Sequence, residues 1–258
     1  MKSRALASTA VVFLATTAIH ATDRYVSSDG EYGKDVEGAA CYTDLQTAVT
    51  AAQAGETVWV DDGFVCDSGI NANKARINIT NKAITLRSKS GLVDEAQGLG
   101  ATIRGPGAFC ADPDQARCIN SAGSAPVIQG FVLENGYSGP SDNGGCVAGG
   151  GCRLVNCVIR NGKGYRGGGV SSASCEKCVI TNNVSTQMGG GVYLALDLHS
   201  CTIAYNSATQ YGGGIGIWAQ SAAVYSNCLI FGNSAIQQGG GIALRGSANI
   251  VRVMDCVI

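Results

Sequence analysis

Cys201-Thr-Ile203, then Asn206, then Gly212-Gly213-Gly214-Ile215 form one copy of a unit that is repeated through the C-terminal half of the chain. Each copy joins a Cys-x-Ile box, an asparagine and a glycine triplet that is followed by Val or Ile. Four copies are present and a fifth is begun; they open 21, 23, 27 and 28 residues apart, at Cys157, Cys178, Cys201, Cys228 and Cys256. A period in this range predicts a solenoid, in which each repeat buries its apolar side only against its neighbours.

Short strands are predicted for these units. Apolar residues alternate with period two in the Cys-x-Ile box and after each triplet, and Gly, Asn and Ser bound both segments. When the copies are aligned, like residues recur one coil apart, as in the series Val170, Val192, Ile215 and Ile242. This arrangement predicts an all-β parallel β-helix of about eight coils that rise by roughly 4.8 Å. Each buried Ile or Leu should contribute about 2 kcal/mol, so the columns hold the coils together.

The glycine triplets and the asparagines are expected at the corners between strands. Each glycine costs about 0.5–1 kcal/mol of backbone entropy relative to Ala, so the triplets need a steric reason. The expected reason is that the backbone takes positive φ there and that neighbouring coils approach closely. Asn tolerates the left-handed conformation, and stacked Asn amides can hydrogen-bond from coil to coil. The residues concerned are Asn135, Asn161, Asn183, Asn206 and Asn233.

Two copies carry a more specific resemblance. Phe231-x-Asn233-x-Ala235 before its triplet, and Asn206-Ser-Ala208 before the preceding one, resemble the repeat of bacterial polymorphic outer-membrane proteins. That repeat has a Phe-x-x-Asn box and a Gly-Gly-Ala-Ile box. The chain differs by having Gly in place of Ala and an aromatic residue one place closer to Asn. Over residues 24–258 the chain also resembles secreted proteins of the pectate-lyase-like superfamily, which implies a right-handed β-helix.

The first 21 residues have the pattern of a secretory signal peptide. Lys2 and Arg4 precede an apolar run, and Ile19-His20-Ala21 fits a cleavage site. We expect removal of residues 1–21 and export of residues 22–258 to the extracellular space, a bacterial cell surface or the outer membrane; an uncleaved anchor is the alternative. The 12 cysteines and the low fraction of charged residues, 14%, agree with export. A net charge of −1 gives no basic surface for nucleic acid, and after removal no long apolar segment remains to insert into a membrane.

A short capping α-helix is predicted near the N-terminus. Thr43-Asp-Leu-Gln46 has the pattern of a capping box, and Gly55 ends the helix. Its apolar face should cover the open first coil, as in many secreted right-handed β-helices, and consists of Leu45, Ala48, Val49 and Ala52.

One elongated domain is expected beyond the signal peptide. Residues 24–63 form its cap, residues 64–151 irregular coils and residues 152–258 the regular repeats. Met254-Asp-Cys-Val-Ile258 opens a new strand with nothing to cover it. We therefore expect the full protein to carry more repeats and a terminal cap or anchor, and the uncapped coil to allow self-association.

The cysteines are expected to have two kinds of role. Those of the column lie at the coil spacing, slightly beyond the roughly 3.5–4.5 Å between Cβ atoms that a disulfide requires, so buried free thiols are favoured over a chain of disulfides. Disulfides are expected in the irregular part, between Cys41 and Cys66 and between Cys110 and Cys118. Cys175-Glu-Lys-Cys178 has no second pair at metal spacing, so no metal site is predicted.

A polysaccharide lyase on this fold would need acids that hold Ca²⁺ and an Arg or Lys that takes a proton. Arg160, Lys163 and Arg166 are weak catalytic candidates, but Glu176 and Asp197 are the only acids in neighbouring coils. Solvated surface positions are therefore favoured over a catalytic site. We expect no cofactor, with Ca²⁺ only under the lyase alternative.

Two aromatic residues are predicted to bind ligand. If Val192 and its counterparts point inward, then Tyr193, Ala195 and Trp218 point outward. Tyr193 and Trp218 would be diagonal neighbours with small residues beside them, so their ring faces would be open for sugar stacking. The alternative is that the segment 220–227 folds back and covers the rings.

These features favour a secreted or cell-surface β-helix repeat protein that presents an extended adhesion or binding surface without catalysis of its own. Its expected partner is a polysaccharide or a ligand on a host or cell surface. The alternative is a polysaccharide lyase or glycoside hydrolase of acidic polysaccharides, which would require an acid cluster on one outward strand. The third hypothesis is a structural spacer in a larger surface protein.

Overall fold

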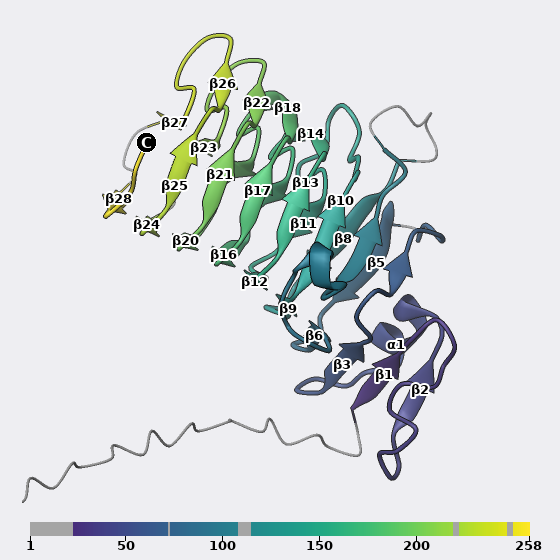
Figure 1. The fold of residues 1–258 in the computed structure, drawn as a ribbon. Coiled ribbons are helices and arrows are strands. Elements are labelled where there is room, and N and C mark those ends of the chain that lie inside the picture. The colour runs from purple at the N-terminus through teal and green to yellow at the C-terminus, as the bar shows by residue number, and fades with distance from the viewer. Residues whose placement is uncertain (1–22, 72, 108–114, 219–221, 247–249) are drawn as a thin grey trace, which may run out of the picture.

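The structure is a computed structural model that describes residues 23–71, 73–107, 115–218, 222–246 and 250–258. Its coils stack from a cap near the N-terminal end to the C-terminus (Figure 1). Three parallel sheets run along the stack, and each regular coil supplies one strand to each sheet. Seven coils have a described strand in each of these three sheets, and β28 (Val251–Met254) opens an eighth coil. The predicted parallel β-helix is confirmed.

Beside the three long sheets, the strands form a shorter fourth sheet. Sheet 1 contains, in spatial order, β2 (Ala40–Tyr42), β1 (Arg24–Val26), β3 (Thr57–Val60), β6 (Thr85–Ser88), β9 (Val127–Gln129), β12 (Arg153–Val155), β16 (Ser174–Glu176), β20 (Asp197–His199), β24 (Ala223–Ser226) and β28. Sheet 2 contains β4 (Val65–Cys66), β7 (Ala101–Arg104), β10 (Phe131–Glu134), β13 (Val158–Arg160), β17 (Val179–Thr181), β21 (Thr202–Ala204) and β25 (Leu229–Phe231). Sheet 3 contains β5 (Ala75–Thr80), β8 (Arg117–Ala122), β11 (Val147–Gly149), β15 (Val170–Ser171), β19 (Val192–Tyr193), β23 (Ile215–Trp218) and β27 (Ile242–Arg245). Sheet 4 is a shorter addition with β14 (Lys163–Arg166), β18 (Val184–Met188), β22 (Ser207–Ala208) and β26 (Ser234–Ala235).

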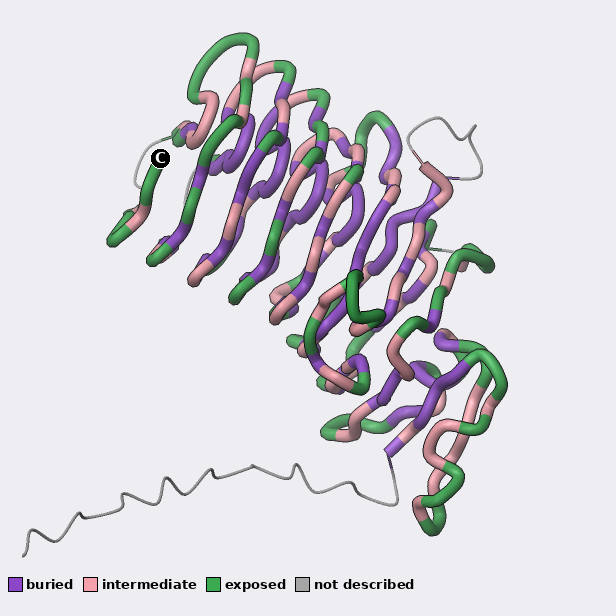
Figure 2. Tube along the Cα trace, viewed as in Figure 1, coloured by how far each residue is buried: buried purple, intermediate pink, exposed green. Residues whose placement is uncertain are grey.

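Columns of like residues fill the interior, as the repeat predicted. On sheet 2 the register aligns six buried residues, namely Ile103, Leu133, Ile159, Ile180, Ile203 and Ile230. Figure 2 shows the buried segments recurring from coil to coil along the stack. The column cysteines lie just before sheet 2, each after a residue with positive φ such as Asn156 or Asn227. Phe131 takes the cysteine position in an earlier coil, because Val132 aligns with Val158.

The glycine triplets have two separate steric reasons. The first glycine of each triplet has a φ between 61° and 67°, a left-handed conformation that favours glycine. The second glycine touches the neighbouring coil. A Cβ atom on Gly190 would lie 2.3 Å from the carbonyl oxygens of both Ser207 and Gly213, which leaves no room for a side chain. The expected positive φ and the close approach of coils are both confirmed.

The asparagines divide between the two expected roles. Asn135 and Asn161 adopt the left-handed conformation, with φ of 58° and 56°. Asn183, Asn206 and Asn233 instead form a ladder along the stack. Asn183 Nδ2 donates to Asn206 Oδ1 at 3.0 Å, and Asn206 Nδ2 donates to Asn233 Oδ1 at 3.0 Å. Asn183 and Asn206 are fully buried, so their side-chain amides form hydrogen bonds within the ladder instead of hydrogen bonds to water.

The cap contains the predicted helix. Helix α1 (Leu45–Ala51) packs Leu45, Ala48 and Val49 into the core, together with Ala52 directly after it. The helix begins after Asp44, whose Oδ1 accepts a hydrogen bond from the Thr47 backbone N at 2.7 Å. The predicted capping box, which started at Thr43, is one residue too early. An aspartate is at least as good an N-cap as threonine, so Asp44 takes that position.

The cysteines in the structure are free thiols. Those of the column are buried apart from the half-buried Cys256, in agreement with the favoured interpretation. The expected disulfide between Cys41 and Cys66 is not formed, because Cys41 aligns with Tyr25 on sheet 1 whereas Cys66 aligns with Ile103 on sheet 2. The other expected partners are Cys118, which is a free buried thiol, and Cys110, which lies outside the described residues.

The asparagine ladder predicts a stability effect. Asn206→Ala removes hydrogen bonds to both neighbouring coils and leaves the buried backbone N of Asn183 without its acceptor, while Asn183 Nδ2 keeps only Ile159 O. We expect the free energy of unfolding to fall by about 2–4 kcal/mol, measured by guanidinium titration followed by circular dichroism. Thr186→Ala, at an exposed position of β18, is the control. Equal unfolding midpoints for the two variants would contradict a stabilising role of the ladder.

The buried thiols predict how stability depends on pH. Burial raises the pKa of Cys152 to about 12, and the hydrogen bond with Cys178 raises the pKa of Cys201 to about 12. An unfolded thiol has a pKa of about 8.5, so each thiol contributes stability that is complete below that pH and is lost as the pH rises toward 12. We expect the denaturation midpoint to fall between about pH 9 and pH 11, and to fall less in Cys201→Ala, which cannot ionise. A midpoint that stays constant over this range would refute the prediction.

Candidate functional site

Aromatic and arginine side chains gather where sheet 4 meets the outward side of sheet 3. We call this group the arginine–aromatic surface, and its members are Tyr165, Arg166, Tyr193, Tyr211, Trp218 and Arg245. β14 supplies the first two, and β19, β23 and β27 supply Tyr193, Trp218 and Arg245. The parallel register brings them together, since Trp218 aligns with Arg245 and Tyr211 forms a bridge to Met188 at the end of β18.

The indole of Trp218 is within reach of two guanidinium groups. Arg166 Cζ lies 5.4 Å from a ring centroid of the indole, and Arg245 Cζ lies 5.8 Å from it. Arg245 also lies over the ring of Tyr211, with its Cζ 4.0 Å from the ring centroid. Guanidinium groups at these distances are attracted by the electron-rich ring faces. Trp218 nevertheless remains 42% exposed, so part of its ring is open to a ligand.

Tyr193 does not have the open ring that was predicted. Its side chain is on the outward side of sheet 3, but the residue is only 3% exposed. Met188 of β18 packs against it, Arg166 Cζ lies 5.3 Å from the ring centroid, and Arg166 Nη1 donates to Tyr193 Oη at 3.1 Å. The prediction failed because sheet 4 folds over this part of sheet 3. The alternative, a cover formed by the segment 220–227, is also wrong for its described part, since Ala223–Ser226 forms β24 of sheet 1.

A break in the strand alternation separates Tyr193 from Trp218. Leu194 has a φ of 51°, and this left-handed residue turns the next side chain inward. Ala195 is therefore buried in the core at 1% exposure, although alternation predicted that it points outward. β23 has no residue with positive φ between Ile215 and Trp218, so the alternation continues and Trp218 stays outward.

Arg166 is held by neutral groups. Its Nε donates to Gln187 Oε1, and Gln187 Nε2 in turn donates to Tyr165 Oη at 2.7 Å. Its Nη1 donates to the hydroxyl of Tyr193. No carboxylate forms an ion pair with Arg166 within the part of the chain that the structure describes. Its positive charge is therefore available to an anionic group of a ligand.

The three basic catalytic candidates do not form one site. Arg160 lies on β13 of sheet 2, where its side chain points outward, whereas Lys163 and Arg166 belong to β14 of sheet 4. Lys163 Nζ lies 5.7 Å from the ring centroid of Tyr137. Of the three, only Arg166 contributes to the arginine–aromatic surface.

Two acids that the sequence analysis did not consider neutralise Arg160. Its Nε donates to Glu134 Oε2 at 2.8 Å, and its Nη1 and Nη2 donate to the Glu95 carboxylate at 3.0 and 2.7 Å. Arg104 Nε also donates to Glu134, at 2.7 Å. Burial opposes ionisation of Glu134, but the hydrogen bonds from both arginines lower its pKa overall. Hydrogen bonding to Glu95 raises the pKa of Arg160, so this guanidinium is a poor proton acceptor and instead fastens the segment around Glu95 onto sheet 2.

Alignment of the coils could have identified part of this network. Arg104, Glu134 and Arg160 occupy the same outward position on three successive strands of sheet 2. Opposite charges at adjacent positions of this kind attract one another. Glu95 gives no such signal, because it lies in the short 3₁₀ helix η1 (Glu95–Gln97) outside the repeat.

Metal ligation and membrane insertion have no support in the described structure. Within the residues that the structure describes, no group of three or more His, Cys, Asp or Glu side chains could hold a metal ion. In the same residues, no helix is long and apolar enough to span a membrane.

Comparison with known proteins identifies the fold family. A family model described as a right-handed β-helix region matches residues 118–258, which are more than half of the 258 residues of the chain. The matched region contains every member of the arginine–aromatic surface. No curated protein and no solved structure matches the chain. The coil architecture and this match together show that the chain belongs to the right-handed β-helix family.

Proposed function

We propose that this protein is exported and binds a polysaccharide through the arginine–aromatic surface, without catalysis of its own. The observation that carries this proposal is the indole of Trp218, which is 42% exposed and has the guanidinium groups of Arg166 and Arg245 close to its ring. The flat apolar faces of sugar rings stack on exposed aromatic rings. Guanidinium and phenol groups beside the ring can pair with sugar hydroxyl and carboxylate groups.

The surface suits an extended ligand. Its members come from four successive coils, from Arg166 in β14 to Arg245 in β27. At about 4.8 Å per coil, they extend over roughly 14 Å along the stack. A chain of sugars that lies along the stack would therefore contact Trp218 and both arginines at once, whereas a single sugar would contact only part of the surface.

An anionic polysaccharide is the favoured class of ligand. Arg166 is bonded to an amide and a phenol, and no carboxylate neutralises it in the described structure. A carboxylate or sulfate group of a ligand can form the charge-assisted hydrogen bonds that these neutral partners do not provide.

Export to a cell surface is part of the same proposal. It is supported by the signal pattern of residues 1–21, which lie outside the described residues, and by the resemblance of the repeats to bacterial polymorphic outer-membrane proteins. The resemblance to pectate-lyase-like proteins is compatible with a lyase or hydrolase, the alternative. That alternative has less support, because Arg160 is paired with two acids and Arg166 supports the ring of Tyr193.

The proposal predicts a loss of binding on removal of one indole. Trp218→Ala should reduce retention by at least about tenfold on a panel of immobilised neutral, uronate-containing and sulfated polysaccharides, because the exposed stacking ring is lost. Tyr205→Ala is the matched control, since Tyr205 is 59% exposed but belongs to the corner beside Phe231. If the parent protein binds no member of the panel, or if Trp218→Ala is retained as strongly as the parent on every polysaccharide that the parent binds, the proposal is wrong.

The charge of Arg166 predicts which polysaccharides are preferred. Arg166→Gln should weaken binding of uronate or sulfated polysaccharides and reduce its salt dependence, because one guanidinium is removed. Arg166→Lys keeps the charge but loses the planar fork, so it should fall between the parent and Arg166→Gln. Retention measured at several salt concentrations tests this order. Equal salt dependence of the parent and Arg166→Gln would exclude a charge contribution from this residue.

A further inference from the structure

An irregularity in the repeat places one more side chain beside the arginine–aromatic surface. Between its pairings with Gly164 and Arg166 of β14, strand β18 has one residue more than β14 has. The extra residue forms a β-bulge, so that Thr186 and Gln187 together lie opposite Tyr165. A bulge changes the direction of a side chain at one position of a strand. Here Thr186 is exposed, whereas Gln187 is half-buried and is bonded to both Tyr165 and Arg166.

The side-chain amide of Gln187 joins two members of the surface. Its Oε1 accepts a hydrogen bond from Arg166 Nε, and its Nε2 donates to Tyr165 Oη at 2.7 Å. A guanidinium group can only donate, so the carbonyl of the amide has to face Arg166 and its NH₂ group faces the phenol. Arg166 Cζ also lies 5.1 Å from the ring centroid of Tyr165. Gln187 therefore fixes the position of the guanidinium relative to the ring.

The guanidinium of Arg166 keeps hydrogen-bond donors for a ligand. Its described hydrogen bonds, to Gln187 and Tyr193, use two of its five N–H groups, and the residue is not fully buried. A carboxylate or sulfate can accept from Nη1 and Nη2 together. Asp142 contacts the same strand through its backbone O, but its carboxylate lies 3.4 Å from Arg117 Nη2 and pairs with that residue.

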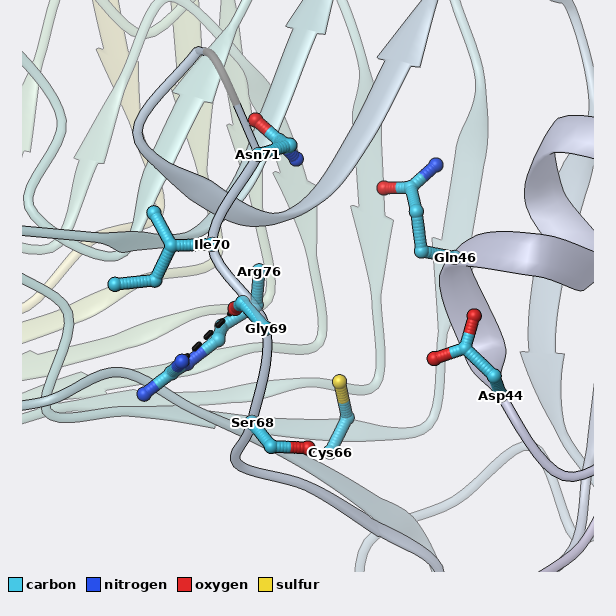
Figure 3. Close-up of a pocket in the computed structure, with 8 residues that line it drawn as sticks. All are labelled: Asp44, Gln46, Cys66, Ser68, Gly69, Ile70, Asn71 and Arg76. Carbon is cyan, nitrogen blue, oxygen red and sulfur yellow. Dashed lines mark hydrogen bonds between the residues drawn. The ribbon is translucent and has the colours of Figure 1, made fainter.

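Arginines elsewhere in the described structure are bound to acids or to the backbone. Those that form ion pairs with acids include Arg24, Arg104, Arg117, Arg153 and Arg160. Arg76, in the cap, donates to two backbone carbonyl oxygens; Figure 3 shows its bond to Gly69 O, with the guanidinium directed away from Asp44. Arg166 differs because its acceptors are an amide and a phenol. An amide in place of a carboxylate at position 187 leaves its charge uncompensated.

We propose that Gln187 determines the ligand specificity of the arginine–aromatic surface, because it holds the Arg166 guanidinium beside Trp218 without neutralising it. This inference rests on the proposed function and adds the group that is selected, a carboxylate or sulfate next to the sugar that stacks on Trp218. A glutamate at position 187 would have the same size and accept from the same Nε, but its charge would cancel that of Arg166. Stacking of a neutral sugar on Trp218 would be unaffected.

Gln187→Glu tests the proposal, and Gln210→Glu is the matched control. Gln210 has the equivalent position in the next coil, where its backbone N donates to Gln187 O at 3.0 Å. It is two coils from Arg166, or about 10 Å, so an added charge there is largely screened.

The measurement is retention on immobilised polysaccharides at several salt concentrations. In Gln187→Glu, retention on uronate-containing and sulfated polysaccharides should fall by at least about tenfold and become less dependent on salt. Retention on neutral polysaccharides should stay within about twofold of the parent, because the indole of Trp218 is unchanged. A purely structural role of Gln187 would lower both kinds of retention together.

Three results would overturn the inference. In the first, Gln187→Glu loses no more retention on anionic polysaccharides than Gln210→Glu does. In the second, it loses neutral and anionic retention equally. In the third, the parent retains neutral polysaccharides alone. The proposed stacking on Trp218 survives each of these results, whereas a parent protein that retains no polysaccharide would refute both proposals.

A second variant covers the case in which Gln187→Glu does not fold, as judged by circular dichroism. Gln187→Leu has a similar size and no charge, but it loses both hydrogen bonds and releases the guanidinium. Retention on anionic polysaccharides should then fall by about threefold or more, while neutral polysaccharides are retained as by the parent. Anionic retention equal to that of the parent would overturn the inference.

Discussion

The close contact between successive coils at the second glycine of three triplets, those that begin at Gly167, Gly189 and Gly212, is the constraint on which the rest of the structure depends. Carbonyl oxygens of the next coil lie where the Cβ atoms of Gly168, Gly190 and Gly213 would be. Only glycine permits this contact. The asparagine ladder and the sheet hydrogen bonds require the same coil spacing, so the triplets set the distance at which every other column can form.

The triplets also determine where the functional surface lies. Each sheet 4 strand runs between a ladder asparagine or its equivalent and a triplet, and the left-handed first glycine then returns the chain to sheet 3. This return places β14 and β18 over the outward side of sheet 3. Tyr193 is covered as a result, while Trp218 lies beyond the cover. The repeat step rises from 23 to 27 residues between these two coils, and the longer coil continues in extended conformation to Trp218 instead of turning at the position of Leu194.

Features that repeat in the sequence could be predicted from it, and features that arise between unlike segments could not. The spacing of Cys178, Cys201 and Cys228 predicted the coils, and the alternation around them predicted the core. The same reasoning failed at Tyr193 because sheet 4 has no clear apolar alternation and therefore gave no sign of covering the ring. It failed for the disulfide between Cys41 and Cys66 because that region has no repeat from which a register can be taken.

The central claim is that coil contact at the triplets holds the regular repeats together. Gly190→Ala tests it most directly, because its added Cβ would meet two backbone carbonyl oxygens at 2.3 Å and no flexible side chain could move away. The measurement is the free energy of unfolding by guanidinium titration, with Thr186→Ala, at an exposed position on the preceding strand, as the reference. We predict that the free energy of unfolding of Gly190→Ala is lower than that of the parent by about 3 kcal/mol or more, while the reference variant stays close to the parent protein. A Gly190→Ala variant as stable as the parent would contradict it.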